Sequence, residues 1–170
     1  MNRLALPALL LTALAPAPLA QSSGTASGTA SGPPTVTSRA ATRTVQVVFV
    51  AGHEGHNNGL NYNGDARGEK TLTVPLGWTV EVSLSNAGRM PHDFAVVAGS
   101  AVPTDFSKVR LAFANAATSV IAPGGAAAAT RFVANRPGTY LIVCRVGRHA
   151  QNGMYLKMTV SNNVKAPTYR

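Results

Sequence analysis

Cysteine, acidic residues and long apolar runs are all scarce in this chain. Its 170 residues include one Cys and four His, and six Asp and Glu stand against fifteen Lys and Arg. A single cysteine can form no internal disulfide, which excludes a disulfide-stapled fold. The basic residues form no run and do not alternate with aromatic residues, so the sequence argues against a nucleic-acid-binding protein.

The excess of basic residues is spread along the chain. The net charge is +9 at pH 7, and residues 44–164 hold ten Lys and Arg against six Asp and Glu. A positive surface attracts acidic proteins and anionic surfaces and steers their approach. The sequence therefore favours acidic protein partners, although the same charge would also serve solubility alone.

Residues 1–20 have the layout of a secretory signal. Arg3 gives a positive start, an apolar stretch runs from Leu4 to Leu14, and small residues lead to Ala20. We expect cleavage after Ala20 and export to the periplasm or the cell surface. The alternative is an uncleaved anchor, but the apolar run is shorter than the roughly 20 residues that a membrane-spanning helix needs.

Composition divides the rest of the chain into three parts. Residues 21–43 are rich in Ser, Gly, Thr, Ala and Pro, which bury little apolar area, so we expect a flexible linker there. Residues 44–164 form the expected single domain, and residues 165–170 form a C-terminal tail.

From Thr44 onward the pattern is that of an all-β protein. Short runs rich in Val, Thr and Leu recur between Gly, Pro and Asn residues, and apolar side chains alternate with polar ones within them. About eight such runs favour an antiparallel β-sandwich with Greek-key connections. One stretch departs from the alternation, because Thr104 and Asp105 are suited to cap a short helix over residues 105–116.

The residues that carry chemistry are His92, Cys144, His149 and Met154. The last three form a Cys-x4-His-x4-Met pattern, and His92 lies upstream. A thiolate, two imidazoles and a thioether suit copper that cycles between Cu(II) and Cu(I), and a weak axial Met is typical of blue-copper sites. Cys144 alone would indicate only a small buried apolar side chain, but the His and Met at ligand spacing favour a metal centre.

Strand periodicity places three of these side chains on interior faces. Alternate residues of a strand point to opposite sides of the sheet, and each of the three shares its parity with an apolar neighbour: His92 with Phe94, Cys144 with Ile142, and Met154 with Leu156. The loop over residues 145–153 is expected to bring His149 to the same point, at the rim of the domain.

Several segments around these residues are typical of a known family. The chain resembles the cupredoxins, and among them sulfocyanin, over roughly residues 45–162. The resemblance is carried by LNYNG at 60–64, VPLGWTV at 74–80, PHDF at 91–94 and the segment from Gly138 to Met154. It implies a type 1 blue copper protein that shuttles single electrons. It also implies one copper ion with His92, Cys144 and His149 as equatorial ligands and Met154 as the axial ligand.

Two positions depart from the family pattern. The residue after the first ligand histidine is often Asn in cupredoxins, where it helps to tie the two ligand loops together, and here it is Asp93. The sulfocyanin loop usually has Pro-Gly before the second histidine, and here Gly147 and Arg148 occupy those positions. Neither departure removes a ligand, but both bear on the reduction potential and the rigidity of the loop.

The expected function is that of an exported, monomeric electron carrier rather than an enzyme, with a cytochrome or terminal oxidase as its redox partner. Arg89, Arg145 and Arg148 lie near the ligands in the sequence. Cations there should raise the reduction potential and steer acidic partners to the site, or they are solvated loop residues of little effect.

Other functions fit the residues less well. A copper chaperone or store is the second hypothesis, but such proteins tend to use exposed Met or His tracts, which this sequence lacks. Copper oxidases need a second copper site, and one Cys with four His leaves no room for it. His53 and His56 could bind a second metal, although a solvated loop is the simpler interpretation of that pair.

Overall fold

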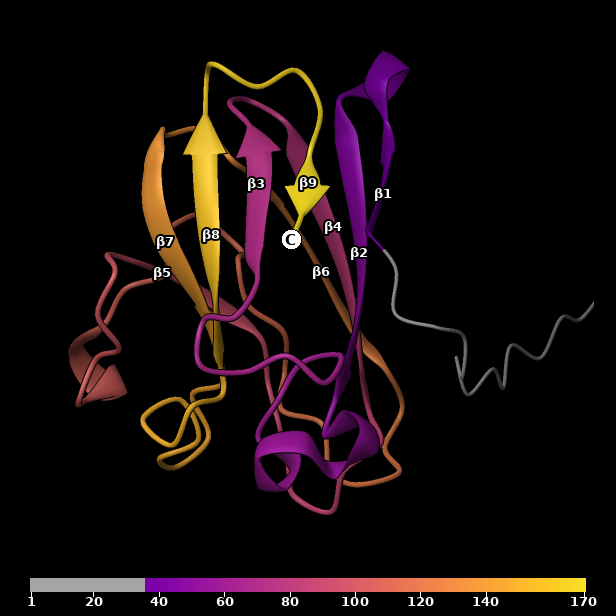
Figure 1. Cartoon of the computed structure of the whole chain (residues 1–170), viewed down its shortest axis with the longest axis vertical. Coiled ribbons are helices and arrows are strands. Elements are labelled where there is room, and N and C mark those ends of the chain that lie inside the picture. The colour runs from indigo at the N-terminus through magenta and orange to yellow at the C-terminus, as the bar shows by residue number, and fades with distance from the viewer. Residues whose placement is uncertain (1–35) are drawn as a thin grey trace, which may run out of the picture.

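The computed structural model describes residues 36–170, which form a sandwich of two β-sheets (Figure 1). The expected signal at 1–20 and most of the expected linker at 21–43 lie outside the described residues. One sheet has the order β1-β2-β4-β6 and the other the order β5-β7-β8-β3-β9. The strands are β1 (Val36–Arg39), β2 (Thr44–Ala51), β3 (Thr71–Pro75), β4 (Thr79–Asn86), β5 (Ala95–Ala98), β6 (Ala128–Val133), β7 (Gly138–Val143), β8 (Tyr155–Ser161) and β9 (Thr168–Tyr169).

Helical structure in the described part of the chain is limited to three 3-10 segments: η1 (Ala40–Thr42), η2 (His53–Gly59) and η3 (Phe106–Lys108). None of the helices among residues 36–170 has the length and apolar character that a membrane crossing requires.

The alternating pattern of the sequence forms the core as predicted. The inward residues of β2 and β4 are almost fully buried, and the polar residues that alternate with them are partly exposed. The buried inward residues are Val45, Val47, Phe49, Val80, Val82 and Leu84. The Phe49 ring lies 5.5 Å from that of Tyr62 and 5.9 Å from that of Phe94, measured between centroids. Apolar burial between the two sheets therefore holds the sandwich together.

The predicted all-β sandwich is confirmed, but two strand pairs are parallel and not antiparallel as the sequence suggested. β2 runs parallel to β4, and β3 runs parallel to β8. The chain leaves β2 through η2, forms β3 in the opposite sheet, and returns to the first sheet as β4. Parallel neighbours need such a crossover, whereas a hairpin makes antiparallel ones.

Strands of the described residues lie beyond 44–164, the expected domain, at both ends. β1 lies within the segment expected to be a linker and pairs antiparallel with β2. β9 lies within the expected C-terminal tail and pairs with β3. Residues 36–170 therefore form nine strands, where the sequence indicated about eight.

The helix expected over residues 105–116 is reduced to η3. Asp105 caps it as predicted, because its carboxylate accepts a hydrogen bond from the Ser107 N–H at 2.8 Å. Beyond η3 the backbone instead pairs with the edge strand β5: the Ala112 N–H donates to Val96, and the Val96 N–H donates to Ala116. An exposed sheet edge has unpaired backbone groups, and this segment satisfies them.

Candidate metal centre

Three side chains meet at one end of the sandwich. The Cys144 Sγ lies 3.5 Å from Nδ1 of His149 and 3.9 Å from Nδ1 of His92. The two imidazole centroids are 5.1 Å apart. One ligand atom from each residue lies within 4.8 Å of the others, and this is the one such group of three or more within residues 36–170. The structure thus brings together the thiol and both imidazoles that the sequence singled out.

Backbone hydrogen bonds shape the loop that follows β7. Cys144 is the first residue after β7, and Met154 is the last before β8. The Cys144 N–H donates to the Met154 carbonyl at 3.2 Å, and the Met154 N–H donates to the His149 carbonyl at 2.9 Å. Met154 is fully buried. The main chain therefore fixes the relative positions of Cys144, His149 and Met154 without help from their side chains.

His92 reaches the same place from a separate loop. Its N–H and carbonyl both pair with Ile121, at 3.0 and 2.7 Å. Its side chain is fully buried, with Nδ1 toward Cys144, and Nε2 has no hydrogen-bond partner among the described residues. A Cβ added at Gly88 would come within 3.3 Å of that Nε2. The absence of a side chain at Gly88 therefore lets its loop close over the imidazole.

Burial keeps the site uncharged in the absence of a metal. Burial, and then the neighbouring His149, lower the pKa of His92 to about 4. Burial also lowers the pKa of His149, against a smaller opposing effect of Asp93. Burial raises the pKa of Cys144 to about 12. Both histidines are then neutral at neutral pH, and each can bind a metal through a ring nitrogen, whereas the thiol must lose its proton to do so.

Asp93 joins the two ligand segments. Its backbone N–H points at the Cys144 sulfur, 3.5 Å away. Its carboxylate accepts the backbone N–H of Arg145 at 2.6 Å and the Arg145 guanidinium at 2.7 and 2.8 Å. The Tyr62 hydroxyl donates to the Asp93 carbonyl at 2.6 Å. Sequence reasoning marked Asp93 as a departure but did not find its pairing with Arg145, because 52 residues separate them.

Exposure separates the two histidines. His92 and Cys144 are fully buried, whereas His149 is partly exposed. His149 belongs to the loop between β7 and β8, and that loop lies at the lower end of the molecule in Figure 1. The predicted position of His149 at the rim is therefore confirmed.

The donor set fits a copper ion. Metal bonds to imidazole nitrogen and thiolate sulfur are about 2.0–2.3 Å long, so two such atoms around one ion lie up to about 4 Å apart. The Cys144–His92 and Cys144–His149 separations, 3.9 and 3.5 Å, are within that range. Two imidazoles and a thiolate with a nearby Met are typical of blue copper.

The histidines at 53 and 56 belong to no comparable cluster within residues 36–170. The His56 Nδ1 is hydrogen-bonded to the Gly64 carbonyl, and His53 lies 3.5 Å from the exposed Glu54 carboxylate. Asn61, fully buried, accepts from the His53 N–H and donates to the His56 carbonyl. This segment is a tightly hydrogen-bonded turn.

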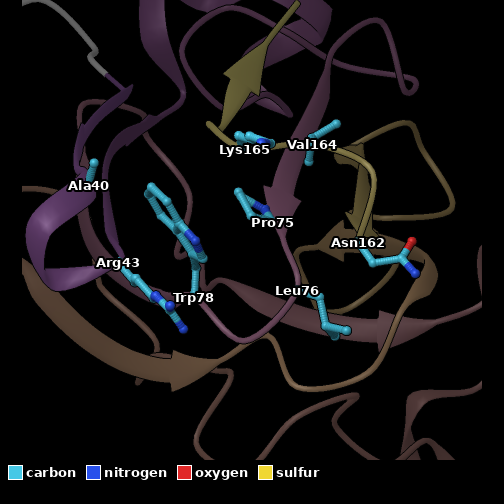
Figure 2. Close-up of a pocket in the computed structure, with 8 residues that line it drawn as sticks. All are labelled: Ala40, Arg43, Pro75, Leu76, Trp78, Asn162, Val164 and Lys165. Atoms are coloured by element: carbon cyan, nitrogen blue, oxygen red, sulfur yellow. The ribbon is translucent and has the colours of Figure 1, made fainter.

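The surface of residues 36–170 includes two hollows. The larger of the two, about 440 Å³, is formed by η1, the β3–β4 turn and the segment after β8 (Figure 2). It lies at the end of the sandwich opposite to the loop between β7 and β8 (Figure 1). Trp78, Arg43 and Lys165 are among the residues that line it. The smaller, about 290 Å³, adjoins the ligand loop and is lined by Asp93, Phe106, Ser107, Val120, Arg145 and Val146.

Known proteins are similar to this chain in sequence and in fold. The Sulfocyanin (SoxE) domain family matches residues 31–170. A sulfocyanin of Sulfolobus acidocaldarius is 28% identical over 134 residues, which are 74% of this chain and 67% of that protein. The crystal structure of dithionite-reduced auracyanin from Roseiflexus castenholzii has a TM-score of 0.50 at 26% identity and covers 68% of this chain and 96% of its own. The crystal structure of a rusticyanin variant has a TM-score of 0.51 at 26% identity and covers 70% of this chain and 78% of its own.

Proposed function

Because the chain belongs to the sulfocyanin family of cupredoxins, we propose that it carries single electrons between redox partners as a mononuclear blue copper protein. The observation that supports this most directly is the meeting of one buried thiol with two imidazole nitrogens. His92, Cys144 and His149 are the proposed equatorial ligands, and Met154 is the axial one. Copper, when bound, supplies the one-electron couple.

The chain contributes a rigid frame. Electron transfer is fast when the site rearranges little between redox states. Backbone hydrogen bonds tie Cys144, His149 and Met154 to one another, and two bonds tie His92 to Ile121. The Asp93 N–H points at the sulfur, and a hydrogen bond to a ligand sulfur stabilises its thiolate form and tunes the potential. The frame therefore holds the same arrangement for both redox states.

His149 is the proposed electron port. It is the one proposed ligand that is partly exposed, whereas the other three are fully buried. An imidazole edge at the surface gives a short path between the metal and a docked partner. The buried side chains meanwhile exclude water from the thiolate.

The surface around the port suits an acidic redox protein. Arg89 and Arg148 are exposed and Arg145 is partly exposed. The hollow of about 290 Å³ adds the apolar side chains of Phe106, Val120 and Val146, and Val120 is 56% exposed. Positive charge speeds the encounter with an acidic partner. We propose a cytochrome or terminal oxidase of a respiratory chain as that partner, outside the cytoplasm.

The test is reconstitution with Cu(II). We expect an intense visible charge-transfer band that bleaches reversibly with reductant. Cys144→Ser should abolish the band, because no thiolate remains to donate charge to the metal. His53→Ala is the matched control, since His53 lies in the described structure outside the cluster, and it should keep the full band. Failure of the parent to develop the band, with tight binding of Cu(I) only, would favour a copper-handling protein instead.

A further inference from the structure

Asp93 is the acidic residue with the least access to solvent in the chain. Its side chain is 2% exposed, whereas the side chains of Glu54 and Glu81 are 79% and 36% exposed. A buried carboxylate is costly unless it is paired and hydrogen-bonded. Here every near donor comes from one residue: Arg145 supplies its backbone N–H, Nε–H and a terminal guanidinium nitrogen.

This ion pair adjoins the proposed copper ligands on both sides. Asp93 directly follows His92, and Arg145 directly follows Cys144. The Asp93 backbone also points its N–H at the Cys144 sulfur. A charge in this position acts on the metal through a buried interior, where screening by water is weak. The net charge of this ion pair should therefore affect the reduction potential of the metal more than exposed charges do.

We infer that Arg145 is a positioning residue that neutralises Asp93 beside the metal and locks the two ligand segments together. The neutral Asn that is frequent at this position in the family would tie the loops without adding charge. This chain instead uses a charged pair, so the tie and the electrostatic balance depend on Arg145. The effect of Arg145 on the reduction potential rests on the proposed function, whereas its role in holding the two ligand segments together does not.

The charges predict opposite shifts of the reduction potential. Arg145→Gln leaves the Asp93 carboxylate uncompensated, and negative charge favours Cu(II), so the potential should fall. Asp93→Asn removes the negative charge and keeps an oxygen for the Arg145 N–H, so the potential should rise. The reduction potential of the double variant, Asp93→Asn with Arg145→Gln, should be close to that of the parent, because both charges are removed together. A residue that acted only on stability would not produce shifts of opposite sign.

Arg148→Gln is the matched control. It removes the same charge from the same loop, but Arg148 is exposed and has no ion pair in the described structure. Its effect on the potential should be clearly smaller than that of Arg145→Gln. Equal shifts for the two arginine variants, or shifts of the same sign for Asp93→Asn and Arg145→Gln, would overturn the electrostatic role.

The unfolding of the metal-free proteins tests the lock independently of copper. Arg145→Gln should raise the unfolding equilibrium constant on the order of tenfold to a hundredfold, because it leaves the buried Asp93 carboxylate without its partner. The partly exposed position of Arg145 admits water, which lowers that cost. Arg148→Gln should change it by less than about threefold. Adding Asp93→Asn to Arg145→Gln should recover most of the loss. If the double variant did not recover stability, the role of Arg145 in holding the two ligand segments together would be refuted. Failure of the parent to form a blue site would count only against the proposed function.

Discussion

The main-chain N–H of Met154 donates to the carbonyl oxygen of His149 at 2.9 Å, so one backbone hydrogen bond joins two of the four proposed ligands. Cys144 closes the same loop through its own N–H, which donates to the Met154 carbonyl at 3.2 Å. The backbone at position 154 is therefore held independently of the methionine side chain, which allows that side chain to be changed without dismantling the loop.

Met154→Leu should keep the copper and raise its reduction potential. Leucine has a similar volume, so the fold should lose less than about 1.5 kcal/mol. The Cu(II) state would lose its weak sulfur donor and gain a more apolar neighbour, and both changes favour Cu(I). Met158→Leu is the control, because Met158 is also fully buried but belongs to β8, away from the loop. Voltammetry that shows equal shifts for both variants would contradict an axial role for Met154.

Gly52→Ala should destabilise the protein much more than Gly55→Ala. Both glycines have left-handed backbones, with φ of 68° and 67°, and that conformation costs other residues about 1–2 kcal/mol. A Cβ at Gly52 would lie 2.5 Å from the Gly88 Cα, whereas a Cβ at Gly55 meets nothing within 4 Å. The clash should add roughly 1–3 kcal/mol. Denaturant unfolding of both variants measures the difference, and equal losses would show that the Gly52–Gly88 approach is not required.

Copper binding at neutral pH should release one proton. Burial raises the pKa of Cys144 to about 12 and lowers that of His92 to about 4, so the thiol is protonated and the imidazole is not. The proton lost is therefore that of Cys144, and the apparent affinity should rise about tenfold for each pH unit between neutral pH and about 12. Titration calorimetry in buffers of different ionisation enthalpy counts the protons. Release of two or more would mean that a histidine is protonated in the metal-free site.

Local sequence features determined much of the site in advance. The two-residue period of a strand assigned His92 and Cys144 to the interior, and both are fully buried. The spacing of Cys144, His149 and Met154 set a loop between β7 and β8 of the expected length. An Asn-Gly dipeptide favours a tight turn, and the structure has one at Asn63 and Gly64, closed by two backbone hydrogen bonds between Tyr62 and Asp65. These features follow from near neighbours in the chain, and near neighbours are visible in a sequence.

The tertiary structure alone decided which distant segments meet. Whether β2 pairs parallel or antiparallel to β4 depends on the route of β3 through the other sheet, which no local pattern records. The segment 109–116 has helical spacing, yet its backbone pairs with the edge of β5, because unsatisfied groups at a sheet edge compete with helix formation. Asp93 and Arg145 are separated by 52 residues and become partners only when the two ligand segments are folded against each other. The sequence by itself therefore determined the kinds of side chain and the faces they occupy, and the packing of the sheets decided their partners.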